Sequence, residues 1–173
     1  MEHGEMMSQP VSPGTARSDQ PQLLTHIDRT GEATMVDVSQ KPLSHRNAIA
    51  GGTIFLHPGT IDLIESDQVA KGNVLATARL AGIMAAKKTG ELIPLAHPLP
   101  ITHAEVRFEI PESRDRILIS ASAQITSRTG VEMEALAAVS IAALTIYDMC
   151  KAADKEMRID DVRLISKEKV PVS

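Results

Sequence analysis

Two alternating segments leave this chain little choice of local structure. Residues 104–110 (AEVRFEI) alternate apolar and charged side chains, and residues 117–126 (ILISASAQIT) alternate again after the turn-forming sequence PESRD. Alternation of this kind is typical of strands with one buried face, and two such strands joined by a short polar turn form a hairpin. We therefore expect an antiparallel sheet at the centre of the fold.

Helix and strand patterns flank this hairpin in a regular order. Residues 72–88 are rich in alanine with apolar side chains at helical spacing, and Gly90 is expected to close that helix. A more apolar helix is expected over residues 131–155, while residues 49–56 and 161–167 indicate the first and last strands. The order strand, helix, strand, strand, helix, strand predicts an α+β, ferredoxin-like (split βαβ) fold, an antiparallel sheet with helices packed on one face.

The remaining segments set the expected domain boundaries. Residues 1–22 are rich in Ser, Pro, Gly and Gln, which is typical of a disordered leader. Residues 23–167 have the length of one domain, and a loose tail is expected over residues 168–173. Alternation in residues 33–39 (ATMVDVS) predicts a short extra N-terminal strand.

Composition argues against several function classes. With a net charge of -4, two Phe, one Tyr and no Trp, the chain has neither an excess of cations nor the aromatic side chains that nucleic-acid binding uses. It shows no signal pattern and no apolar run long enough to span a bilayer, so we expect no membrane partner and a cytoplasmic location. Cys150 is the single cysteine and the six histidines lack paired ligand spacing, so we expect no metal site.

The apolar helix carries charged residues only near its two ends. After residues 135–147 (ALAAVSIAALTIY), Asp148 and Lys151 share one helix face, as a solvated ion pair or as part of a catalytic site. At the start of the helix, Glu132 and Glu134 either complement the helix dipole or bind a ligand. Roughly 30 Å of helix separates the two ends, so a site that uses both requires two subunits.

Two further cations lie in restricted positions. His97 is held between Pro94 and Pro98, which suits ligand binding or proton transfer as well as simple packing. Lys71 precedes a helix, where it binds phosphate or only water. Taken together, a cation-rich site with one acid suits a polyanionic substrate such as a nucleotide-like triphosphate.

Four long segments carry a family resemblance: THIDRTGEATMVDVSQKP, KGNVLATARLAGIMAAKKTGELIPLAHPLP, TGVEMEALAAVSIAALTIYDMCKA and VRLISK. Through them, residues 24–167 closely resemble the molybdenum cofactor biosynthesis protein C family. The resemblance implies a lyase of molybdenum cofactor (molybdopterin) biosynthesis that converts 3′,8-cyclo-7,8-dihydroguanosine 5′-triphosphate to cyclic pyranopterin monophosphate and releases diphosphate. It also implies a homohexamer, a trimer of dimers, with active sites at subunit interfaces. We expect no required cofactor, with Mg²⁺ accompanying the triphosphate left open.

The resemblance also assigns roles to residues. Asp148 and Lys151 match the catalytic pair, in which Lys151 transfers protons unless Asp148 holds it charged and makes it an electrostatic stabiliser. The positions that match substrate-binding or other active-site residues are Leu95, Ala96, His97, Met133, Glu134, Lys71, Glu132, Lys167, Arg46 and Lys87. Ala96 replaces a cysteine that relatives often have, so that cysteine is not indispensable here. Two alternatives stay open, a non-catalytic module that binds a small regulator and a scaffold that has lost activity.

Overall fold

The computed structural model describes residues 33–172. In chain order its elements are β1 (Ser44–Phe55), α1 (Pro58–Glu65), α2 (Val74–Lys87), α3 (Thr89–Leu92), β2 (His103–Glu109), β3 (Arg116–Ser127), α4 (Glu132–Cys150) and β4 (Arg158–Pro171). The predicted leader over residues 1–22 lies outside the described residues.

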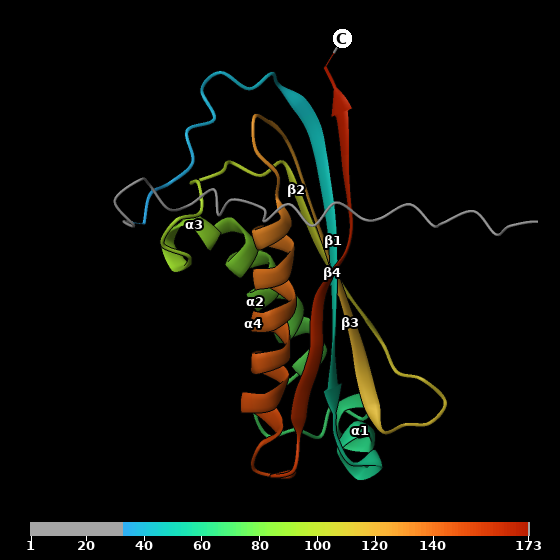
Figure 1. Ribbon diagram of the computed structural model, residues 1–173. Coiled ribbons are helices and arrows are strands. Elements are labelled where there is room, and N and C mark those ends of the chain that lie inside the picture. Colours follow the sequence, from blue (N-terminus) through green and yellow to red (C-terminus); the bar gives the residue numbers. More distant parts are fainter. Residues whose placement is uncertain (1–32, 173) are drawn as a thin grey trace, which may run out of the picture.

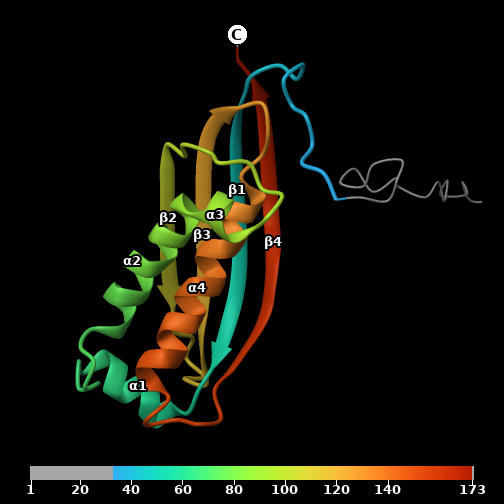
Figure 2. The same ribbon diagram turned by 90° about the vertical axis from the view of Figure 1, so that its left-hand side faces the viewer.

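The four strands form one antiparallel sheet in the order β2-β3-β1-β4. Helices α2 and α4 lie side by side on the same face of this sheet (Figures 1 and 2). The split βαβ arrangement follows, because β1 and β2 run in the same direction with β3 between them. The predicted ferredoxin-like fold is therefore confirmed.

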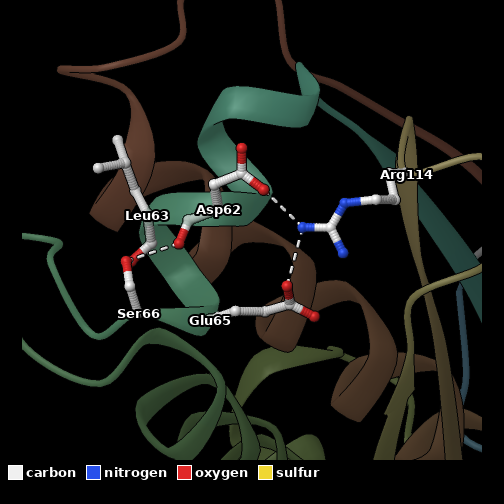
Figure 3. A network of polar contacts seen from close by, with 5 residues as sticks. All are labelled: Asp62, Leu63, Glu65, Ser66 and Arg114. Carbon is white, nitrogen blue, oxygen red and sulfur yellow. Dashed lines mark hydrogen bonds and ion pairs between the residues drawn. The ribbon is translucent and has the colours of Figure 1, made fainter.

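The hairpin of β2 and β3 has the predicted faces. Val106 is buried beneath the helices, whereas Glu105 and Arg107 form an ion pair on exposed side chains. At the turn, Arg114 donates hydrogen bonds to Asp62 (2.6 Å) and Glu65 (2.8 Å) of α1, and Figure 3 shows its guanidinium reaching both carboxylates. These two bonds fix the hairpin turn against α1.

Helix α4 forms the centre of the core because its side chains are small. Ala135, Ala138 and Ala142 are fully buried, and a Cβ atom at Gly82 of α2 would lie only 2.8 Å from the Ala138 carbonyl oxygen. The two helices therefore approach closely only with glycine at position 82. By length and composition α4 is also apolar enough to cross a membrane, but half of that stretch is buried in the protein, as in core helices generally.

Four sequence predictions about boundaries are wrong. The strand predicted over residues 33–39 does not form: Ala33 makes only a single bridge, residues 34–38 have no regular structure, and the Val36 carbonyl oxygen accepts a hydrogen bond from the ring of His97. Helix α4 ends at Cys150, so residues 151–155 do not continue it. Strand β4 extends to Pro171 through pairing with β1, where a loose tail was expected. Gly90 lies within the short helix α3 and does not close α2.

Candidate active site

Three charged residues meet at the C-terminal end of α4, and we call them the aspartate–lysine cluster. Lys151 caps the helix and its Nζ lies 2.7 Å from Asp148 Oδ1. Lys71 comes from the turn before α2, where its Nζ lies 2.6 Å from Asp148 Oδ2 and donates to the Asp148 carbonyl oxygen at 2.9 Å. One carboxylate is thus held between two ammonium groups from segments far apart in sequence.

The electrostatics of the aspartate–lysine cluster follow from these contacts. Hydrogen bonds from Lys151 and Lys71 lower the pKa of Asp148 to about 2. In return, the hydrogen bond with Asp148 raises the pKa of Lys151. About half of each side chain is exposed, so this charged group is open to a ligand.

At the opposite end of α4 lies a cavity of about 540 Å³, which we call the N-terminal cavity. It is lined by Val36, Val38, Lys41, Leu95, Ala96, His97, Leu99, Thr129, Gly130, Glu132, Met133, Glu134 and Lys167. Seven of the predicted substrate-binding positions are among these residues. His97 Nε2 lies 3.0 Å from the Val36 carbonyl oxygen, so Nε2 carries a proton and donates it to that oxygen.

The two glutamates of the N-terminal cavity differ in their surroundings. Glu132 is partly exposed and its Oε1 lies 3.2 Å from Lys167 Nζ. Glu134 is only 3% exposed and forms no ion pair with any described residue. Burial, together with the neighbouring charge of Glu132, raises the pKa of Glu134, although a hydrogen bond from its own backbone amide opposes this shift. Glu134 is therefore a buried acid facing a cavity, with a destabilised charge.

The other three predicted site residues, Lys87, Arg46 and Lys71, do not line the N-terminal cavity. Lys87 lines a second cavity of about 330 Å³, which shares Leu99 and Glu134 with the first. Arg46 donates from Nη2 to the Arg128 carbonyl oxygen at 3.4 Å, while its Nε is buried without a partner among the described residues. Lys71 belongs to the other end of α4.

Sequence reasoning missed two cations near this end. Lys41 lines the N-terminal cavity, but no local pattern distinguishes it from a solvated lysine. Lys169 lies on the same face of β4 as Lys167, because β4 pairs regularly with β1 from Ser166 to Pro171. The alternation of the strand indicates Lys169 only once β4 is known to extend so far.

The two groups of charged residues lie far apart in the chain. The 19 residues of α4 separate the aspartate–lysine cluster from the N-terminal cavity by about 28 Å. Cys150 is buried, and burial raises the pKa of its thiol to about 11, so it is no nucleophile. Within residues 33–172, no group of three or more His, Cys, Asp or Glu side chains is arranged to hold a metal ion.

Fold and site together define a class of protein, a ferredoxin-like α+β domain that carries cationic and acidic side chains at both ends of its central helix. The chain belongs to the MoaC family, whose model matches residues 35–169.

Named relatives agree with this assignment. The chain is 56% identical to the cyclic pyranopterin monophosphate synthase of Thermomicrobium roseum over 144 residues, 83% of this chain and 87% of the relative. It is 56% identical to the protein of that name from Clostridium perfringens, with 83% and 91% covered. Cyclic pyranopterin monophosphate synthase 3 of Mycobacterium tuberculosis is 54% identical over 150 residues, with 87% and 84% covered.

Proposed function

We propose that this protein is a cyclic pyranopterin monophosphate synthase of molybdenum cofactor biosynthesis. It converts 3′,8-cyclo-7,8-dihydroguanosine 5′-triphosphate to cyclic pyranopterin monophosphate and releases diphosphate. The observation that carries the proposal is the aspartate–lysine cluster, in which Lys71, Asp148 and Lys151 meet within 2.7 Å contacts, inside the segment that the family model matches. The names of its relatives support the same reaction.

The active site lies between two subunits. The cluster and the N-terminal cavity are about 28 Å apart in one chain, too far for one small substrate. The sheet face opposite the helices is uncovered by the described residues and carries Leu118 and Ile165, both more than a third exposed. Burial of such a face against another copy favours an oligomer. A hexamer built as a trimer of dimers is the assembly we expect.

Cationic side chains and one buried acid bind different parts of the substrate. His97 and Lys167 in the N-terminal cavity, and Lys71 of a neighbouring subunit, bind the phosphates, with Lys87 in the adjoining cavity and Arg46 on β1 as further cations. Glu134 and the backbone at Met133 hold the guanine-derived ring, whose N–H edge donates to a carboxylate. Leu95 and Ala96 form the adjoining wall, and Glu132 orients Lys167.

The reaction at the phosphates displaces diphosphate from the α-phosphorus. A hydroxyl of the substrate attacks the α-phosphorus, forms the new P–O bond of the cyclic phosphate and breaks the bond to the leaving diphosphate. Because Asp148 raises the pKa of Lys151, Lys151 is protonated at neutral pH. Lys151 therefore stabilises the developing charge and donates a proton, while abstraction of protons falls to another group.

No resident cofactor is required in this scheme, and Mg²⁺ enters only with the triphosphate. The enzyme acts in the cytoplasm, on a small nucleotide-derived substrate and without nucleic-acid or membrane partners.

The experiment measures diphosphate and pyranopterin formation by the purified full-length protein, beside the variant Lys151→Ala. Turnover by the wild type and loss in Lys151→Ala support both function and mechanism. Turnover by both the wild type and Lys151→Ala would support the function and exclude the catalytic role of Lys151. If the folded wild type binds the intermediate and Lys151→Ala binds it equally, with no diphosphate released by either, the protein is a binding module. No binding and no turnover by the folded oligomer would indicate a scaffold that has lost activity.

A further inference from the structure

One buried acid lies outside both parts of the site. Asp154 follows α4 in the turn that leads to β4, and only 2% of its surface is exposed. Fully buried aspartates are rare and need hydrogen-bond partners, because removing a carboxylate from water is costly. The contacts of its carboxylate oxygens therefore indicate what Asp154 does.

The Asp154 carboxylate accepts three hydrogen bonds. The backbone amide of His57 donates at 2.8 Å and the hydroxyl of Thr60 at 3.3 Å, both to Oδ2, while the backbone amide of Glu156 donates to Oδ1 at 3.0 Å. Burial raises the pKa of Asp154, but the hydrogen bonds from these amides outweigh it and hold the pKa below its ordinary value. The residue is thus a charged acceptor at neutral pH.

These bonds supply a missing helix cap. His57 is the N-cap residue of α1, and its own side chain makes no capping hydrogen bond. An acidic group beside the first amides of a helix satisfies a free donor and complements the helix dipole. Here the cap comes from a residue 97 positions later in the sequence, so it also joins two segments.

The joined segments are those that build the aspartate–lysine cluster. Helix α1 leads through a short turn to Lys71, whereas Asp148 and Lys151 lie just before Asp154 at the end of α4. Between Cys150 and Asp154 the turn is tight, since the amides of Ala153 and Asp154 both donate to the Cys150 carbonyl oxygen. Figures 1 and 2 show α1 and this turn at the same end of the molecule.

We propose that Asp154 is a positioning residue that holds the Lys71 segment against the end of α4 and so fixes the geometry of the aspartate–lysine cluster. Its effect on turnover rests on the proposed function, but its effect on the cluster does not. Loss of the bond between the segments lets Lys71 move away from Asp148, and sub-ångström displacements of such groups are enough to slow a reaction.

The test compares Asp154→Asn with a milder variant of the same contact, Thr60→Val, and with a control elsewhere in the fold, Thr89→Val. Asp154→Asn keeps the shape and removes the charge. Thr60→Val removes the longest of the three bonds and leaves the carboxylate, while Thr89→Val removes a buried hydroxyl bond of 3.1 Å to Ala85, far from the cluster in sequence and at the other end of α2. Two readouts are used, the kinetics of diphosphate release and the pKa of Asp148, followed by ¹³C NMR of carboxyl-labelled protein and assigned with Asp148→Asn.

For Asp154→Asn we expect kcat to fall about tenfold with KM changed less than about twofold, because positioning is lost but binding groups remain. The pKa of Asp148 rises from about 2 toward its ordinary value. Thr60→Val gives the same changes more weakly, and Thr89→Val lowers the melting temperature without either change. A lower melting temperature in Asp154→Asn with kcat and the pKa of Asp148 unchanged would overturn the proposal. Since the titration needs no substrate, it decides the matter even if the wild type shows no turnover.

Discussion

The acidic residues at the two ends of α4 have opposite surroundings. At the C-terminal end, Asp148 is half exposed and paired with two lysines, and its pKa is lowered. At the N-terminal end, Glu134 is buried with no ion-pair partner among the described residues, and its pKa is raised. The first end is already arranged as a stable charged group, whereas at the second end ionisation of Glu134 destabilises the folded protein.

This contrast separates catalysis from stability. Exposed ion pairs contribute little to folding, so under the proposed function we expect changes at the C-terminal end to alter activity far more than stability. A buried, unpaired acid reduces stability, so its replacement by a neutral side chain alters both, in opposite directions. The four predictions that follow test this contrast, beginning with the largest effect.

Asp148→Asn removes the charge that holds both lysines in the aspartate–lysine cluster. We expect kcat to fall by roughly a thousandfold or more, because the lysines that stabilise charge at the reacting phosphates lose the carboxylate that positions them, while the melting temperature at pH 7 changes by less than about 2 °C. Steady-state diphosphate release and calorimetry measure the two quantities.

The matched control is Asp62→Asn, which breaks a surface ion pair of equal length, 2.6 Å, with Arg114. It should leave turnover unchanged. Equal losses of activity in both variants, or a large loss of stability in Asp148→Asn, would show that the C-terminal end of α4 is structural.

Co-expression of Lys151→Ala with Glu134→Gln tests whether the two ends of α4 meet across subunits. Each variant alone is expected to be inactive. In a dimer that pairs the two variants, one site carries both substitutions and the other site carries neither. About half of randomly assembled dimers pair the two variants, so about a quarter of all sites are intact and about a quarter of wild-type activity returns. Separate affinity tags on the two chains allow the mixed oligomers to be purified and assayed. Mixed oligomers without activity would place both ends in separate sites.

The sequence predicts the order of elements because the alternation in β2 and β3 and the helical spacing in α2 and α4 are local patterns. It also places Asp148 and Lys151 on one helix face, three residues apart. Contacts between distant segments are not local. The bond from Lys71 to Asp148 joins residues 77 positions apart, and nothing in either segment indicates it.

A local sequence pattern does not predict the burial of a single charged residue either. Acids in the first turn of a helix are usually exposed, yet Glu134 is buried and lines a cavity together with residues of α3 and of the loop around Leu99. Asp154 resembles an ordinary turn residue until its bonds to α1 are seen. The end of β4 contains Glu168 and Lys169 with little apolar content, and only its pairing with β1 orders it.

Glu134→Gln should stabilise the protein at neutral pH. Because the pKa of Glu134 is higher in the folded than in the unfolded state, ionisation opposes folding increasingly as the pH rises above the unfolded pKa. We expect a rise in melting temperature of a few degrees at pH 7, and no rise near pH 4, where the residue is largely protonated in both states. Thermal denaturation at the two pH values measures this difference.

Glu132→Gln is the control for that measurement, since Glu132 is partly exposed and paired with Lys167 at 3.2 Å. Its melting temperature should stay equal or fall slightly at pH 7. A decrease for Glu134→Gln as large as that for Glu132→Gln would mean that the Glu134 carboxylate is satisfied in the assembled protein before any ligand binds.

Lys169→Ala tests how far the cationic surface near the N-terminal cavity extends. Strand alternation places Lys169 on the face of β4 that carries Lys167, two residues further from the cavity, and the paired position on β1 is Arg46. A cation at this distance attracts the triphosphate through screened charge, so the variant should raise KM about two- to threefold at low salt, less at high salt, and leave kcat unchanged. Lys155→Ala, at the other end of the molecule, is the control and should leave KM unchanged. A fall in kcat for Lys169→Ala would mean that Lys169 contacts the reacting phosphates directly, and the N-terminal end of α4 would then share in catalysis as well as binding.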